Sequence, residues 1–172
     1  MEPNSRLFLA LWPELRVRNQ FKRLRQQCTW PAAAALARPE SMHLTLHFLG
    51  NVPDARIPLL KRQLNISFDP FELVFSAIKL WPNGIAVIEP ESPSEHLFNL
   101  RTAIGLELQS VGLTTEDRPF RPHVTLARHA QGVAWPAQVQ KQPVQWRVAT
   151  YSLVKSQNIQ AGKYQILHSY GR

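Results

Sequence analysis

A phrase of nine residues occurs twice in this chain of 172 residues. The first copy, residues 38–46, reads RPESMHLTL, and the second, residues 118–126, reads RPFRPHVTL. In each copy Arg-Pro stands shortly before a histidine, and an apolar residue, Thr and Leu follow it directly. The shared core is His-x-Thr-x, at His43 and again 80 residues later at His123. Chance is a poor explanation for two such copies, so we expect them to serve one site.

The residues around each histidine predict a β-strand. The run 42–46 alternates reactive and apolar residues, and side chains two positions apart on a strand share one face. His43 and Thr45 would therefore point to one side, with leucines on the other side in a core. The second copy would present His123 and Thr125 in the same way. By the same alternation, His47 would share the face of His43 and Phe48 would face the core.

Two such strands facing each other would offer two imidazoles and two hydroxyls to one ligand. That combination suits attack on a phosphodiester, with one histidine as general base and the other as general acid. The hydroxyls of Thr45 and Thr125 would hold the non-bridging oxygens. The competing interpretation is packed histidines beside strand-forming threonines. The duplicated context favours catalysis for His43, Thr45, His123 and Thr125.

The stretches MHLTLHFLG (residues 42–50) and FRPHVTLAR (residues 120–128) resemble the paired signatures of the two-histidine, or HxTx, phosphoesterase superfamily. Within it the chain is most similar to the bacterial RNA 2′,3′-cyclic phosphodiesterases, also called 2′-5′ RNA ligases. The resemblance implies an α+β fold, bilobal and pseudo-symmetric. Two antiparallel sheets would flank a central cleft, with helices outside. It also implies a single bilobal domain over residues 1–172.

The resemblance also implies a reaction and roles for residues. Water would open a 2′,3′-cyclic phosphate at an RNA end to a 2′-phosphate, with no cofactor and no metal. His43 would be the acid and His123 the base, although the two copies are too alike to separate these roles from the residues. Arg128 would contact the substrate, and guanidinium groups suit phosphate. Phe48 would pack in the core or stack on a base.

Several other residues have a plain interpretation. Arg121 is a weaker candidate for phosphate contact and could be a surface charge. His47 could be taken for a metal ligand. Its stretch is predicted to be a strand, however, and no Glu or Cys beside it completes a zinc site. Trp81 and Trp135 are expected in the core.

Three alternatives stay open for the function. The same site could run in reverse and join a 2′,3′-cyclic end to a 5′-hydroxyl, making a 2′-5′ linkage. No P-loop is present for an ATP-driven ligase. The chain could instead be a non-catalytic module that binds RNA ends, although both histidines are intact. It could also act on another cyclic or 2′-5′-linked nucleotide.

Charge and composition bear on the partner. Lys and Arg number 20 against 12 Asp and Glu, a net charge of +8, which favours a polyanion such as RNA. No apolar run approaches the roughly 20 residues of a membrane span, and we expect no membrane partner. Cys28 is the only cysteine, so no internal disulfide is possible, which suits the cytoplasm. We expect a monomer.

Hydrophobic periodicity and turn residues predict the remaining elements. A capping box that begins at Ser92, with Pro93 at the first helical position, should open the longest helix. The expected strands are 6–12, 71–81, 85–89, 145–156 and 164–168, the expected helices 13–28, 54–64 and 93–111, and the expected loops 29–38 and 131–143.

Overall fold

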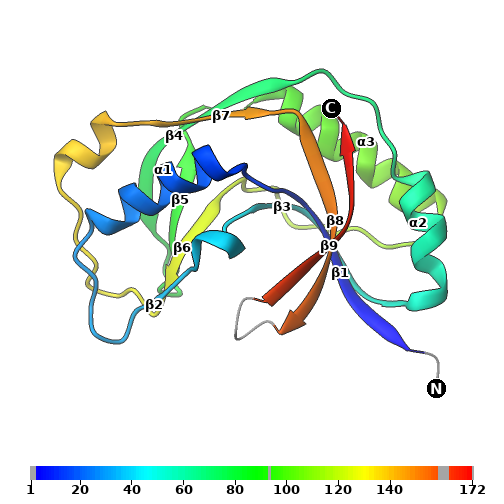
Figure 1. Cartoon of the computed structure of the whole chain (residues 1–172), viewed down its shortest axis with the longest axis horizontal. Helices are drawn as coiled ribbons and strands as arrows, with labels where there is room; N and C mark the ends of the chain where they lie inside the picture. The colour runs from blue at the N-terminus through cyan, green and yellow to red at the C-terminus, as the bar shows by residue number, and fades with distance from the viewer. Residues whose placement is uncertain (1–2, 93, 159–162, 172) are drawn as a thin grey trace.

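The chain forms two antiparallel sheets that lie side by side with helices outside them (Figure 1). The computed structural model describes residues 3–92, 94–158 and 163–171. The four-stranded sheet has the order β3 (Leu44–Pro53), β1 (Asn4–Leu11), β8 (Thr150–Asn158) and β9 (Lys163–Gly171). The five-stranded sheet has the order β2 (Ala35–Leu36), β6 (Val124–Arg128), β5 (Ala86–Pro90), β4 (Phe71–Leu80) and β7 (Val144–Val148). The predicted α+β class with two antiparallel sheets is confirmed.

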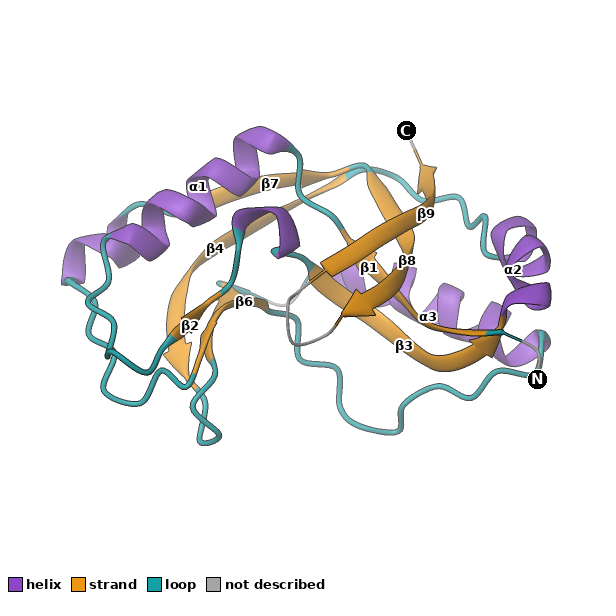
Figure 2. Cartoon of the chain, turned by 60° about the horizontal axis from the view of Figure 1, so that its bottom comes forward, coloured by secondary structure: helices purple, strands orange, loops and turns teal. Residues whose placement is uncertain are grey.

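Two helices each follow a strand of one sheet and pack on the other sheet. Helix α1 (Leu15–Gln26) follows β1 of the four-stranded sheet but packs on the five-stranded sheet, where Phe21 meets Phe75 of β4 edge to face at 5.3 Å. Helix α3 (Glu95–Ser110) connects β5 to β6 but packs on β3 of the four-stranded sheet. Figure 2 shows α1 along β7 and β4, and α3 behind β1 and β3. Each sheet is therefore covered by a helix that follows a strand of the other sheet.

Short helices complete the fold. Helix α2 (Ile57–Gln63) follows the 3-10 turn η2 (Asp54–Arg56), as the expected helix over 54–64. The two predicted loops contain more structure than their composition indicated. The first holds β2 and the second holds the 3-10 helix η3 (Ala137–Lys141), while η1 (Pro39–Ser41) lies between β2 and β3. Among the described residues, no helix is long and apolar enough to cross a membrane.

The strand predicted over 145–156 is in fact two strands in two sheets. β7 ends at Val148 and pairs with β4, whereas β8 begins at Thr150 and pairs with β1 and β9. The prediction was wrong because apolar residues alternate on both sides of Ala149. The alternation changes parity at Ala149, from 144, 146 and 148 to 151 and 153, but a change of parity does not say which sheet each strand joins. One large buried cluster spans both sheets, from Leu9 on β1 to Trp146 on β7.

Strand β3 carries two irregularities that change which side chains face the cleft. Leu9 and Ala10 of β1 are neighbours, but they oppose His47 and Thr45, so one extra residue lies between these two on β3. Such a bulge shifts the alternation of faces by one position. His47 is consequently only 4% exposed and Phe48 is 44% exposed. The faces predicted for both residues were wrong.

The start of α3 differs from the predicted capping box. Ser94, not Ser92, is the N-cap, and its side chain accepts a hydrogen bond from the backbone N–H of Leu97 at 3.3 Å. Pro93 lies outside the described residues. The periodic apolar face of this helix is confirmed, because Leu97, Leu100, Ile104 and Leu108 are buried.

Candidate active site

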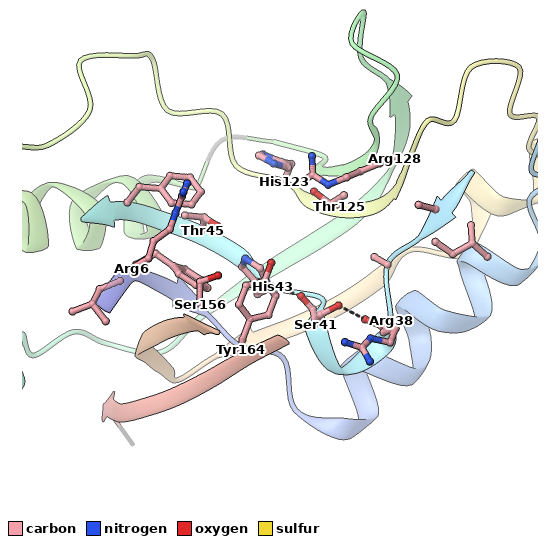
Figure 3. A pocket seen from close by; sticks show the side chains of 16 residues that line it. Arg6, Arg38, Ser41, His43, Thr45, His123, Thr125, Arg128, Ser156 and Tyr164 are labelled. Atoms are coloured by element: carbon pink, nitrogen blue, oxygen red, sulfur yellow. Dashed lines mark hydrogen bonds between the residues drawn. The ribbon is translucent and has the colours of Figure 1, made fainter. Parts of the chain in front are cut away.

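The two repeated phrases meet at one cavity of about 330 Å³ between the sheets. His43 and Thr45 line it from the start of β3, and His123 and Thr125 line it from the start of β6 (Figure 3). Both histidines directly precede their strands, which begin at Leu44 and Val124, so β3 begins two residues later than the predicted run 42–46. Two further predicted site residues, Phe48 and Arg128, line the same cavity.

Both histidines are held by the same local hydrogen bond. Nδ1 of His43 lies 2.7 Å from the backbone oxygen of Ser41, and Nδ1 of His123 lies 2.7 Å from that of Arg121. A carbonyl oxygen only accepts, so Nδ1 must carry the proton in each ring. Nε2 is thereby left as the nitrogen that exchanges a proton with a ligand. The two copies of the phrase therefore hold their histidines in the same tautomer, with the proton on Nδ1.

His43 lies among aromatic rings. Its ring stacks on Trp12 with centroids 4.9 Å apart and an interplanar angle of 3°. Phe8 is 5.1 Å away, and Tyr164 meets the ring edge at 5.2 Å. The pKa of His43 is lowered to about 4, mainly because burial disfavours the charged imidazolium, and the nearby His123 acts in the same direction. The hydrogen bond to Ser41 opposes this shift.

His123 has charged neighbours instead. Trp81 lies 4.5 Å from its ring, and the guanidinium of Arg121 lies over Trp81, also at 4.5 Å. Burial lowers the pKa of His123, while the hydrogen bond to Arg121 and the charge of Glu89 raise it. The positive charges of Arg121 and Arg128 also lower the pKa of His123. The two histidines are therefore alike in hydrogen bonding and different in electrostatic surroundings.

Glu89 organises the surroundings of His123 and was not singled out from the sequence. It is 8% exposed and accepts hydrogen bonds from Lys79 at 2.5 Å, Trp81 Nε1 at 3.1 Å and Arg121 at 3.0 Å. Burial alone would raise the pKa of this carboxyl, but the hydrogen bonds and the cations keep the pKa below its usual value. A lone acid at the end of the apolar run 85–88 was the available signal. The network also brings Trp81, expected in the core, next to the cavity.

The cavity is cationic. Arg6, Arg38 and Arg128 line it, and none of the described residues along its wall is acidic. Ser41, Ser156 and Tyr164 add hydroxyl groups. Arg6, Ser156 and Tyr164 escaped the sequence-based prediction because they come from β1, β8 and β9, far from the repeated phrases. The cavity is equipped to bind an anion and to move protons at two imidazoles.

His47 does not belong to this site. Its Nε2 lies 2.8 Å from the backbone oxygen of Arg101 on α3, so the ring helps attach α3 to β3. Across the described ranges, no group of three or more His, Cys, Asp or Glu side chains is arranged to hold a metal ion.

A family model described as LigT-like phosphoesterase matches the chain twice, over residues 12–87 and 88–162. Each match contains one copy of the repeated phrase. Proteins named RNA 2′,3′-cyclic phosphodiesterase are similar to the chain. The one from Archaeoglobus fulgidus is 26% identical over 128 residues, 72% of each chain. The one from Escherichia coli is 28% identical over 132 residues, 76% of this chain and 75% of its own.

Solved structures match over nearly the whole fold. The crystal structure of E. coli LigT complexed with 3′-AMP superposes with a TM-score of 0.83 at 24% identity, covering 98% of each chain. At that identity the likeness concerns the fold. It includes the two antiparallel sheets.

Proposed function

The chain belongs to the LigT-like phosphoesterase family, and from this premise we propose that it is an RNA 2′,3′-cyclic phosphodiesterase. The observation that carries the proposal is the pair His43 and His123, both lining one cationic cavity with Nδ1 fixed by a backbone carbonyl. The names of the relatives support the choice of substrate. The net charge of +8 also favours RNA.

The proposed reaction is metal-independent hydrolysis with two proton transfers. One histidine accepts a proton from water through Nε2 as the water oxygen bonds to phosphorus. The bond from phosphorus to the ribose 3′ oxygen breaks, and the other histidine protonates that oxygen. The product carries a 2′-phosphate and a free 3′-hydroxyl. Thr45, Thr125 and Arg128 hold the phosphate oxygens as charge develops on them.

The roles of the two histidines can be assigned in two ways. The resemblance to the family implies His43 as acid and His123 as base. The ligand-free site favours the reverse, because a pKa of about 4 keeps His43 neutral and ready to accept a proton. Two effects act against that reversal: an imidazolium is favoured over the face of Trp12, and a bound phosphate anion raises the pKa of both rings. We retain the assignment from the family, and a pH profile decides it.

Phe48 supplies an aromatic face at the edge of the cavity. Phe48 is 44% exposed, although the regular alternation of the strand predicts it inside. Stacking on a nucleobase is worth about 1–3 kcal/mol and accepts any base. We assign Phe48 to the base of the terminal nucleotide.

A product assay tests the proposal. RNA that ends in a 2′,3′-cyclic phosphate is incubated with the protein in EDTA, and 2′- and 3′-phosphate products are resolved. We expect turnover in EDTA with 2′-phosphate as the product. Activity that is lost on chelation and restored by a divalent ion would refute the mechanism. Tight binding without turnover would favour the non-catalytic module. A joined 2′-5′ product, on addition of RNA with a 5′-hydroxyl, would reveal the reverse reaction.

A further inference from the structure

A second cavity of about 200 Å³ adjoins the first and is not lined by Tyr164 or Ser156. Thr45, Phe48 and His123 line both cavities, so the two are adjacent at the start of β3 and at the residues before β6. A strand of RNA with its reacting phosphate between the histidines can therefore extend into the second cavity. The mechanism above gives this space no role.

The walls of the second cavity carry aromatic rings. Phe48 and Phe120 both line it. Phe120 is fixed edge to face against Phe98 at 5.4 Å, and the guanidinium of Arg101 lies over its ring at 4.5 Å. A ring that is already immobilised loses little freedom when a base stacks on it. Aromatic side chains next to cations are the usual surface for single-stranded nucleic acid.

The charges on these walls favour a phosphate. Arg101, Arg118 and Arg121 line the cavity against the single carboxylate of Glu116. That carboxylate pairs with Arg118 at 2.7 Å, which offsets its repulsion of an anion. The side chain of Arg118 is 76% exposed and can reach a backbone phosphate at the surface.

We propose that this second cavity is a nucleotide subsite for the RNA nucleotide adjacent to the one that carries the reacting phosphate. The proposal rests on the proposed function and extends it. The enzyme reads at least two nucleotides of a strand. Its substrate class is an RNA end, in preference to a free cyclic mononucleotide.

The test compares two substrates on the same protein. One is adenosine 2′,3′-cyclic phosphate, and the other is the dinucleotide ApA ending in a 2′,3′-cyclic phosphate. We expect the wild-type protein to have a higher kcat/KM on the dinucleotide. Phe120→Ala should lower kcat/KM on the dinucleotide by roughly fivefold or more, the low end for loss of one base stack, and leave the mononucleotide unchanged. Arg118→Ala, at an exposed position, should act in the same direction without endangering the fold.

Arg147→Ala is the matched control. Arg147 is also an exposed arginine in a surface ion pair, with Glu72, and its loss changes the net charge equally. It should affect neither substrate. Equal kcat/KM for both substrates in the wild-type protein would overturn the subsite, and so would an unchanged dinucleotide advantage in both variants.

A binding measurement separates this proposal from the proposed function. If the wild-type protein turns over neither substrate, the hydrolase assignment fails. Calorimetric titration with ApA ending in a 2′-phosphate and with adenosine 2′-phosphate then still decides the subsite. Tighter binding of the dinucleotide that Phe120→Ala and Arg118→Ala both weaken supports it. Equal affinities refute it.

Discussion

His43 and His123 share one hydrogen-bonding pattern but lie in different surroundings. Each donates Nδ1–H to the carbonyl two residues earlier. Aromatic rings enclose His43, whereas His123 lies beside Trp81 and the charged network around Glu89. This difference gives the acid and base roles a physical basis that the nearly identical phrases lack.

Replacement of either histidine tests the pair. His43→Ala and His123→Ala should each lower kcat by roughly 10²- to 10⁴-fold. The double variant should lose far less than the product of both effects, because groups that act as a unit are not additive. A general acid must be protonated, so His43→Ala should remove the alkaline limb of the pH profile if His43 is the acid. Removal of the acidic limb would reverse the roles, and full activity without either histidine would end the two-histidine mechanism.

The lowered pKa of His43 makes folding stability depend on pH. The unfolded chain binds the proton at about pH 6.5 and the folded protein only at about pH 4. Stability from this residue is therefore fully present above pH 6.5 and is lost as pH falls toward 4, by at most about 3 kcal/mol. Urea unfolding at pH 7 and pH 4.5 should show a smaller difference for His43→Gln than for the wild-type protein. The exposed control His168→Gln should keep the wild-type difference.

Arg128 ends β6, two residues after the second repeated phrase, and lines the cavity. Arg128→Ala should lower kcat/KM by roughly 10- to 100-fold, as expected for loss of a hydrogen bond to a charged group. Circular dichroism should show an unchanged fold, because the side chain is exposed. Arg147→Ala controls for the charge change. A folded Arg128→Ala protein with wild-type kinetics would make Arg128 only a surface charge.

At the scale of elements, the bulge in β3 shapes the cleft. The extra residue between Thr45 and His47 turns Phe48 toward the cavity and His47 toward α3. Arg101 of α3 secures this segment from behind, since its Nε donates to the carbonyl of Leu46 at 3.1 Å. A regular strand would have placed Phe48 in the core and lost the aromatic face that both cavities share.

The cap of α3 gives a test at this scale. Ser94→Ala should lower the free energy of unfolding by about 1 kcal/mol, because the side chain satisfies a backbone N–H of the first turn. Ser92→Ala is the matched control and should change it by less than about 0.5 kcal/mol. Chemical denaturation measures both. The reverse order of effects would restore the capping box predicted to begin at Ser92.

At the scale of the whole molecule, exchange of helices ties the two sheets together. α1 packs on the sheet that contains β4 and β7, and α3 packs on the sheet that contains β3. The chain also passes directly from β7 in one sheet to β8 in the other. We propose that residues 1–172 fold as a single bilobal domain, because each sheet is covered by a helix that follows a strand of the other sheet.

A single domain predicts cooperative unfolding. Differential scanning calorimetry should show one transition, with a calorimetric enthalpy equal to the van't Hoff enthalpy. Fluorescence of the tryptophans and far-UV circular dichroism should report the same midpoint. Two separated transitions would mean that the lobes unfold independently and would contradict the single-domain proposal.

The sequence by itself determined the reactive residues and the repetition that joins them. His43, Thr45, His123 and Thr125 were identifiable because a two-residue period and a duplicated phrase are local properties. Arg128 followed from the resemblance. Most helices and the hairpin of β4 and β5 followed from periodicity and turn residues in the same way.

The tertiary structure decided what depends on distant partners. The position of Phe48 depends on a bulge relative to β1, and the change of sheet at Ala149 depends on which strands are already paired. Glu89 became part of the site only when β4, β5 and the segment before β6 brought Lys79, Trp81 and Arg121 to one carboxylate. Register, burial and such networks arise from contacts between residues far apart in the chain, and no local pattern contains them.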